Sequence, residues 1–159
     1  MVSAYTAFPN KGIRTEPLYV TRIEDADGNT IATFTARSNE VISEETSYKM
    51  IDMMRAVISE GTGLRAKNYV KVDCGGKTGT TNNHSDAWFI GYTPKLTAGV
   101  WVGAEDRQVH FASLALGGGS NMALPIWGIF MKKVLEDGTL GVTKYDQFVA
   151  PQGFSLNLD

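Results

Sequence analysis

Apolar residues recur at helical spacing after Ser43, and this pattern predicts the clearest helix of the chain. One face of this helix carries Tyr48, Ile51, Met54, Val57 and Ile58. Glu44 and Glu45 lie in its first turn, where the helix dipole favours negative charge, and Gly61 and Gly63 follow its end. An apolar stripe of this kind is typical of core packing, so we expect no cofactor on this helix.

Two stretches of alternating apolar and polar residues flank a turn and predict a two-stranded ribbon. The strands are residues 18–24 and 30–36, and the Asp-Gly pair within residues 25–29 is a hairpin signal. Upstream of the ribbon, residues 1–8 have the pattern of the end of a helix, which Pro9 stops.

A continuous apolar run at residues 86–92 predicts a central strand that is covered on both faces. The pattern of strands begins at Lys77, ahead of this run. A turn at residues 93–95 then leads into a third strand at residues 96–103.

The remaining segments are a loop, a connector, a helix and a tail. Residues 64–75 are predicted to be a loop, and the glycines of residues 117–120 a flexible connector. Asn121 is expected to cap a last helix that ends at Gly138. This helix is apolar nearly all round, so we expect it to be deeply buried. Residues 139–159 are interpreted as an irregular tail.

The composition is that of one soluble globular domain, with 159 residues, 43% of them hydrophobic and 20% charged. The net charge is -2 without any basic block, which argues against nucleic acid as a partner. No run approaches the ~20 apolar residues of a membrane span. Cys74 is the one cysteine, so no internal disulfide can form, and we expect it to be a small buried hydrophobe.

The stretch GGKTGTTNNHSDAWFIGYTP at residues 75–94 carries most of the candidate chemistry. Its GKT looks like part of a phosphate-binding loop. That loop needs a glycine five positions before Gly76, and Lys71 stands there instead. The loop should also open a helix, whereas residues 81–92 have the pattern of a turn and a strand. The sequence therefore argues against a nucleotide site.

Two other kinds of site are also disfavoured. His84, Ser85 and Asp86 are adjacent, so they cannot meet in the geometry of a hydrolase triad and are interpreted as part of a polar hairpin turn. His110 is the other histidine, and the scattered acidic residues give no ligand spacing around the pair. We therefore expect neither a metal nor a cofactor.

Lys77-Thr78-Gly79 matches the third motif of the serine acyl-transferases that penicillin inhibits. Further matches follow one another in order through nearly the whole chain. They are M-SAY-AF-N-G (1–12), P---TRIED-DG (17–28), GTG (61–63), GKTGTTN--SDAWFIGYTP (76–94), AGVWVG (98–103) and ALPIW--FM (123–131). With these matches, the chain resembles the C-terminal half of the transpeptidase domain of class A penicillin-binding proteins.

The resemblance implies an α+β fold of the penicillin-binding-protein and serine β-lactamase type, with an antiparallel sheet packed with helices. Residues 1–138 would be the C-terminal part of the domain, which lacks the half that holds the nucleophile. Residues 139–159 would be the tail.

The resemblance also implies roles for residues of the KTG strand, which in this family lies at a sheet edge where a peptide can add beside it. Lys77 would supply positive charge, and the backbone N–H of Thr80 would be one donor of the oxyanion hole. Gly79 would let substrate backbone come close. Thr78, Thr80 and Thr81 are assigned to substrate binding, with the hydroxyls of Thr78 and Thr80 holding a carboxylate. Without the flanking matches, these residues would be a plain strand edge.

The family's nucleophile lies in Ser-x-x-Lys and its second motif is Ser-x-Asn, both upstream of KTG. No serine of this chain has a lysine three positions on, and Thr46-Ser47-Tyr48-Lys49 begins with threonine. Ser155-Leu156-Asn157 matches the second motif but follows KTG, so we interpret it as tail. We therefore expect no nucleophile in this chain, and no activity of the chain alone.

Met1 aligns with an internal methionine of the family pattern, so we expect a fragment of a longer peptidoglycan D,D-transpeptidase that works through an acyl-serine intermediate. Its partners would be stem peptides and β-lactams. It would lie at the extracytoplasmic, periplasmic face of the bacterial cytoplasmic membrane, with an anchor upstream. The missing half would leave residues 96–103 as an open apolar edge, so self-association is expected.

Two alternatives remain open on the same fold. One is a catalytically inactive module that binds a peptide or a protein. The other is a β-lactamase or a D,D-carboxypeptidase. The aromatic run at residues 86–94 and the apolar run at residues 123–131 favour the class A transpeptidases. A glycosyltransferase domain upstream would belong only to that class.

Overall fold

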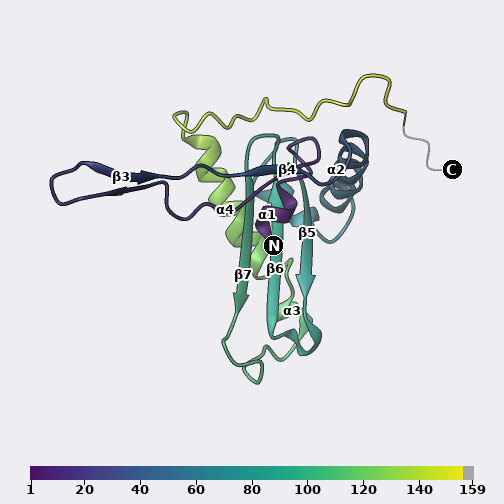
Figure 1. Cartoon of the computed structure of the whole chain (residues 1–159). Helices are drawn as coiled ribbons and strands as arrows, with labels where there is room; N and C mark the ends of the chain where they lie inside the picture. The colour runs from purple at the N-terminus through teal and green to yellow at the C-terminus, as the bar shows by residue number, and fades with distance from the viewer. Residues whose placement is uncertain (156–159) are drawn as a thin grey trace.

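A three-stranded antiparallel sheet in the order β5-β6-β7 forms the centre of the protein (Figure 1). The computed structural model describes residues 1–155. The strands are β5 (Gly75–Thr80), β6 (Asp86–Tyr92) and β7 (Thr97–Gly103). The predicted central strand is confirmed, and so is the turn after it, where the N–H of Thr93 donates to the carbonyl of Leu96 at 2.9 Å.

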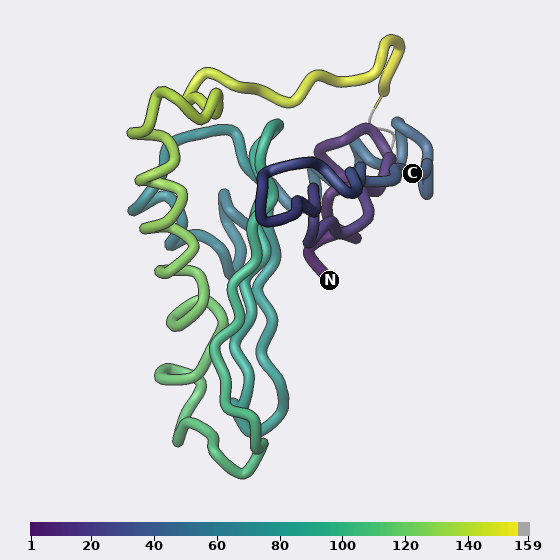
Figure 2. The backbone as a smooth tube through the Cα atoms, turned by 60° about the vertical axis from the view of Figure 1, so that its left-hand side comes forward, coloured from purple at the N-terminus to yellow at the C-terminus, as the bar shows by residue number. Residues whose placement is uncertain are grey.

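One face of the sheet packs against helix α4 (Ala123–Glu136), which lies along it in Figure 2. Phe89 and Trp127 are fully buried there, with their ring centroids 5.1 Å apart. The indole N–H of Trp127 donates to the carbonyl of Gly91 at 3.3 Å. Gly91 leaves room for this ring, because a Cβ there would meet it at 2.6 Å. The main hydrophobic core therefore lies between the sheet and α4.

Part of the opposite face of the sheet is covered by α1 (Val2–Tyr5) and α2 (Glu44–Ser59), which lie near one end of the strands in Figure 2. Ile51 and Met54 of α2 pack with the buried Tyr92 in a second core. The predicted helix after Ser43 is confirmed, and Ser43 caps it, because its hydroxyl accepts from the N–H of Thr46 at 3.2 Å. Helices on a mainly antiparallel sheet make this an α+β fold, as expected.

Two small two-stranded ribbons differ from the sequence-based prediction: one is shorter than predicted and the other was not predicted. They consist of β1 (Ile13–Thr15) with β4 (Ser38–Glu40), and of β2 (Arg22–Glu24) with β3 (Thr30–Thr33). The predicted β2–β3 hairpin is present, but its strands shorten around a bulge between Ile23 and Glu24. The β1–β4 pair was not predicted, because three residues are too few to show alternation.

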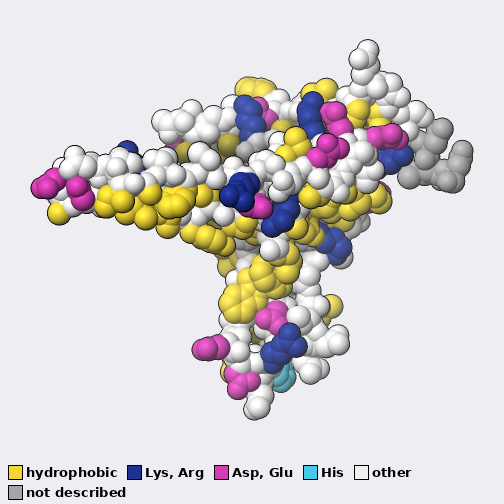
Figure 3. Space-filling model, viewed as in Figure 1, with side chains coloured by type: hydrophobic (Ala, Val, Ile, Leu, Met, Phe, Trp, Pro, Cys, Tyr) yellow, Lys and Arg dark blue, Asp and Glu magenta, His cyan; other side chains and the backbone are white. Residues whose placement is uncertain are grey.

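The β2–β3 hairpin projects from the molecule as an arm, which we define as residues 18–36 (Figure 1). Figure 3 shows apolar side chains along one side of it. Ile23, Ile31 and Phe34 of the arm are exposed. An isolated hairpin has no second layer against which to bury one face, which explains the exposure.

The predicted loop at residues 64–75 is only partly correct. It contains a 3₁₀ helix, η1 (Leu64–Asn68), and its last residue already belongs to β5. Ala66 of η1 is fully buried in the core beside α4. Cys74 is buried as predicted, and burial raises the pKa of its thiol to about 11.

The last helix departs from its prediction in two respects. Asn121 does not cap it, because its side chain contacts Arg65 and the carbonyl of Leu114. The helix is also buried on one side only, and Ile126, Ile129 and Phe130 are each about half exposed. Its apolar outer side is therefore only partly covered by the described residues. Within residues 1–155, the structure contains no helix with the length and hydropathy of a membrane span.

The tail returns from the end of α4 towards α2 in an extended path at the top of Figure 1. No helix or strand occurs in its described part, residues 139–155. The backbone N–H of Phe148 donates to the Asp73 carboxylate at 2.9 Å, and its ring lies edge-on to Tyr92. Asp146 pairs with Lys95 at 2.9 Å. The tail is therefore fastened to the segment just before β5 and to the turn after β6.

Arg55 of α2 contacts both the segment before β5 and the tail. Its Nε donates to Asp73 Oδ1 at 2.8 Å, and its Nη1 donates to Asp52 Oδ1 at 2.8 Å. Its guanidinium also lies 5.1 Å from the centre of the Phe148 ring. The hydrogen bond with Asp73 raises the pKa of Arg55, although partial burial opposes this.

We expect Arg55→Ala to lower the free energy of unfolding by about 2–3 kcal/mol, because it removes charge-assisted hydrogen bonds and leaves Asp73 partly buried without its cation. Urea denaturation of the chain measures this. Lys49→Ala is the matched control in the same helix, since it breaks only the exposed pair with Glu45, which is 2.9 Å long. That change should cost about 0.3–0.5 kcal/mol. Equal losses in the two variants would contradict the role given to Arg55.

Candidate active site

β5 carries Lys77-Thr78-Gly79 and is an edge strand of the sheet, because among the described residues it pairs only with β6. The N–H of Thr81, directly after β5, donates to the carbonyl of Asp86 at 3.1 Å. Backbone groups alternate in direction along a strand. The N–H of Thr80 therefore points away from β6, out of the open edge.

Lys77 and Thr78 also place groups at this edge. The Lys77 ammonium is exposed and donates to the carbonyl of Thr78 at 2.9 Å. The hydroxyl of Thr78 shares a hydrogen bond of 2.7 Å with the hydroxyl of Thr62 in the turn after α2. The edge of β5 thus presents a cation, a hydroxyl pair and an outward N–H within a few residues.

The glycine run at residues 117–119 packs against Thr80 on the α4 side of the sheet. The hydroxyl of Thr80 accepts from the N–H of Gly119 at 3.0 Å. A Cβ at Gly119 would lie 2.4 Å from the carbonyl oxygen of Trp88 and 2.5 Å from that of Gly79. The three glycines are buried. The expected flexible connector is therefore a closely packed segment, in which only glycine fits at position 119.

Thr81 and Asp86 join the two ends of the turn between β5 and β6. The hydroxyl of Thr81 donates to Asp86 Oδ2 at 3.0 Å and accepts from the N–H of Asp86 at 2.9 Å. Ser85 donates to the same carboxylate oxygen at 3.0 Å. The hydroxyl of Thr81 is therefore hydrogen-bonded within the turn, whereas a hydroxyl that binds a ligand directly would point into solvent.

The turn itself contains η2 (Asn82–His84), in which Asn83 and His84 have positive φ angles of 64° and 57°. His84 does not join Ser85 and Asp86 in a triad. Its Nδ1 is buried and has no hydrogen-bond partner among the described residues. The interpretation of these residues as a turn is confirmed.

A polar hollow of about 440 Å³ opens beside the end of β5. It is lined by Thr80, Thr81, Asn82, Asn83, Ser85 and Arg107. Arg107 lies in the loop after β7 and brings a positive charge to the hollow. The outward N–H of Thr80 thus lies next to a space with hydrogen-bonding side chains.

Comparison with known proteins identifies the family. The family model described as "Penicillin binding protein transpeptidase domain" matches residues 1–115. The chain belongs to the penicillin-binding protein transpeptidase family. It is 36% identical over 134 residues to penicillin-binding protein 1A of Aquifex aeolicus, covering 84% of this chain and 18% of the relative. It is also 36% identical over 129 residues to penicillin-binding protein 1A/1B of Bacillus subtilis, covering 72% of this chain and 14% of that one. The chain therefore spans less than a fifth of either relative.

Solved structures support the same fold. The crystal structure of penicillin-binding protein 1A from Haemophilus influenzae superimposes with a TM-score of 0.79 at 23% identity, covering 94% of this chain and 27% of that one. PonA1 from Mycobacterium tuberculosis gives a TM-score of 0.68 at 23% identity, covering 98% of this chain and 45% of that one. The predicted transpeptidase fold is confirmed, and the resemblance to class A members of the family agrees with these relatives.

The five residues predicted from the family motif, Lys77 to Thr81, are contiguous at the open edge and its end. Ser155-Leu156-Asn157 extends beyond the described residues. The motif search missed Gly119 and Asp86, which hold Thr80 and Thr81. A run of three glycines is ambiguous between flexibility and close packing, and an aspartate at the start of a strand does not reveal its partners. The signal that could have found Asp86 is that a charged residue opens the otherwise apolar strand β6.

We expect Gly119→Ala to destabilise the protein by about 1–3 kcal/mol, because the added Cβ would overlap two backbone carbonyls that cannot easily move. Thermal unfolding measures the effect. Gly138→Ala is the control, since nothing lies within 4 Å of the added Cβ there. It should be neutral or slightly stabilising. An unchanged melting temperature for Gly119→Ala would show that the glycine run is loosely packed.

Proposed function

We propose that this chain supplies the KTG wall of a serine-type peptidoglycan D,D-transpeptidase, whose nucleophile lies outside these 159 residues. The observation that carries the proposal is the outward N–H of Thr80 on an edge strand that also bears Lys77. Membership of the transpeptidase family supports it. An inactive binding module is not favoured, because the relatives are penicillin-binding proteins over most of this chain.

The proposed reaction uses the edge of β5 as follows. A stem peptide ending in D-Ala-D-Ala lies beside β5, and Gly79 lets its backbone approach. A serine hydroxyl from the rest of the protein attacks the carbonyl carbon of the penultimate D-Ala. The carbonyl oxygen becomes an oxyanion that accepts from the N–H of Thr80. The proton of the serine hydroxyl passes to the nitrogen of the terminal D-Ala, which leaves as the C–N bond breaks. An amine of a neighbouring stem then attacks the acyl carbon, and the serine oxygen leaves with the proton that this amine gives up.

Each residue of the motif has a role in this proposal. Lys77 places a positive charge beside the serine and favours the negative charge that develops there. Thr78 and Thr80 would contact the substrate carboxylate through their hydroxyls. Thr81 contributes to substrate binding by holding the end of the strand, since its own hydroxyl is engaged with Asp86. A β-lactam would enter as a mimic of the donor peptide and stop at the acyl-serine.

The longer protein is proposed to act at the extracytoplasmic face of the cytoplasmic membrane, where peptidoglycan is crosslinked. Its anchor would lie outside this chain, as the resemblance to class A members implies. No step of the proposed reaction requires a metal or a cofactor.

Intact mass after incubation with excess penicillin tests the assignment of the nucleophile. We expect no adduct on the 159-residue chain, and one penicillin per molecule on the longer protein that contains it. In the longer protein, Lys77→Ala should slow acylation about 100-fold or more, as loss of a group that stabilises developing charge typically does. A stoichiometric adduct on the isolated chain would mean that the nucleophile lies within it.

We further propose that the isolated chain self-associates through β7. This strand is at the edge of the sheet, and Trp101 on it is 46% exposed. Open edges of this kind pair with other chains. Sedimentation velocity should show dimers or larger species that increase with concentration, and Trp101→Lys should reduce them. A monomer over the whole working range of concentrations would contradict this.

A further inference from the structure

We propose that Asp86 is a positioning residue for the oxyanion donor, because it ties the end of β5 to β6 and β7 at the site. This inference rests on the proposed function, since it concerns the same N–H of Thr80. It goes beyond the roles that the family resemblance assigns, which concern Lys77 to Thr81 and not Asp86.

The first observation is the number of groups that converge on Asp86. Its Oδ2 accepts from the hydroxyls of Thr81 and Ser85, each at 3.0 Å. Its Oδ1 accepts from the indole N–H of Trp101 at 2.9 Å. Its backbone carbonyl accepts from the N–H of Thr81, and its own N–H donates to the Thr81 hydroxyl. Asp86 therefore supplies hydrogen-bond partners for both the backbone N–H and the hydroxyl of Thr81.

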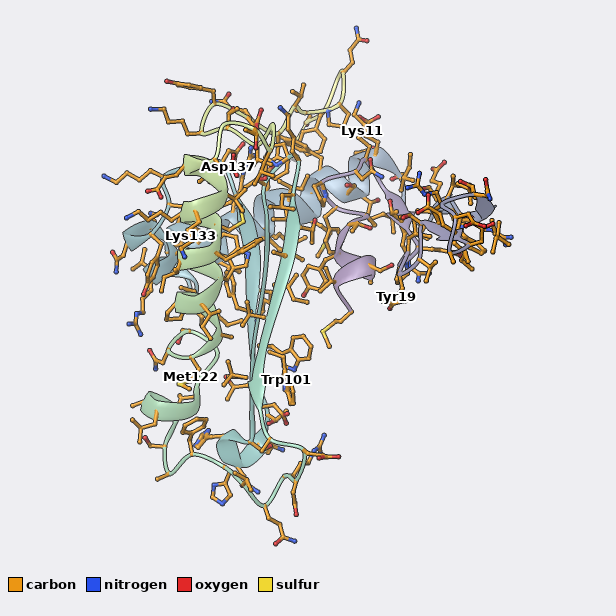
Figure 4. All side chains as sticks on the ribbon, turned by 90° about the vertical axis from the view of Figure 1, so that its left-hand side faces the viewer. Lys11, Tyr19, Trp101, Met122, Lys133 and Asp137 are labelled. Atoms are coloured by element: carbon orange, nitrogen blue, oxygen red, sulfur yellow. The ribbon has the colours of Figure 1, made fainter. Side chains whose placement is uncertain are left out.

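The second observation is the packing that lets Trp101 reach this carboxylate. Asp86 lies directly opposite Gly103 in the register of β6 and β7. A Cβ at Gly103 would lie 2.7 Å from the Trp101 ring and 2.9 Å from its Nε1. The indole thus crosses the place that a side chain at position 103 would fill. Figure 4 shows Trp101 on the side of the sheet away from α4.

The electrostatics agree with this arrangement. The hydrogen bond from Trp101 lowers the pKa of Asp86 most, followed by the bond from Thr81 and then that from Ser85, with a smaller effect of the charge on Arg107. The carboxylate is therefore ionised at neutral pH and accepts all three bonds at once. Hydrogen bonds to an ionised acceptor are stronger than those between neutral groups.

These contacts bear on catalysis because Thr80 precedes Thr81 directly. Thr80 is held on the α4 side by Gly119, whereas Thr81 is held by Asp86. The direction of the Thr80 N–H depends on both anchors, since it alternates with that of the Thr81 N–H. A displacement of about 1 Å in a group that must meet the reacting atom can cost about 100-fold in rate. Loss of the Asp86 side chain should therefore slow acylation without removing any group that contacts the substrate.

The test uses the longer protein that contains this chain and a fluorescent penicillin as the probe. We expect Asp86→Ala to lower the acylation rate constant about 10- to 100-fold while the dissociation constant of the non-covalent complex changes little. Asp86→Asn should recover most of the rate. Its amide oxygen can accept from Trp101, and its amide N–H groups can donate to the hydroxyls of Thr81 and Ser85.

Three further variants separate positioning from general destabilisation. Trp101→Phe removes the indole N–H together with the five-membered ring that carries it, and Gly103→Ala displaces the indole, so both should give smaller losses of the same kind. Asp146→Ala is the matched control, because that carboxylate accepts from the N–H of Thr143 and pairs with Lys95 away from the site. It should leave the acylation rate unchanged. An unchanged rate in Asp86→Ala, or an equal loss in Asp146→Ala, would overturn the inference.

Amide hydrogen exchange keeps the inference distinct from the proposed function. Absence of acylation in the wild-type longer protein would reject the proposed function. Even then, Asp86→Asn and Asp86→Ala can be compared for exchange at the Thr81 amide in the longer protein. We expect loss of protection in Asp86→Ala and retention in Asp86→Asn. Equal protection in both would show that Asp86 does not hold the end of β5. If Asp86→Ala does not fold, exchange at the Thr81 amide in Trp101→Phe and Gly103→Ala tests the inference instead.

Discussion

The candidate site depends on the antiparallel pairing of β5 with β6 along one edge of β5 only. The register places Thr80 opposite Ala87 and Gly79 opposite Trp88. Because hydrogen-bonding groups alternate along a strand, this pairing commits the N–H of Thr81 to the sheet and directs that of Thr80 outwards. A shift of one residue in this register would turn the Thr80 N–H towards β6 and remove it from the open edge.

An edge strand with one free side needs support from other directions if its groups are to stay in place. β5 has such support at both ends. Asp73 lies two residues before it and is bound by Arg55 of α2 and by the tail residue Phe148. At its other end, Gly119 and Asp86 hold Thr80 and Thr81 from opposite faces of the sheet. The strand is therefore fixed by its ends and by one edge, and its other edge pairs with no strand among the described residues.

Several apolar surfaces of the chain are not covered by its described residues. They are the outer side of α4, the side of the arm seen in Figure 3 and the edge of β7. The chain spans less than a fifth of these relatives, and in the longer protein proposed above the other segments would be available to cover these surfaces. We expect these surfaces to be interfaces within that protein, and the self-association proposed for the isolated chain follows from their exposure.

The sequence by itself determined the elements whose signals are local. The helix after Ser43, the strand at residues 86–92 and the Asp-Gly hairpin follow from periodicity, capping and turn residues. The motif at Lys77, together with the matches that flank it, indicated the family. The three-residue strands β1 and β4 are too short for a periodic signal. One-sided burial of α4 and close packing of Gly119 depend on neighbours that are distant in sequence. The direction of the Thr80 N–H depends on its register with β6, and the role of Asp86 on Trp101, which reaches it from the next strand. Only the tertiary structure could decide these features, because each is a relation between segments and not a property of one.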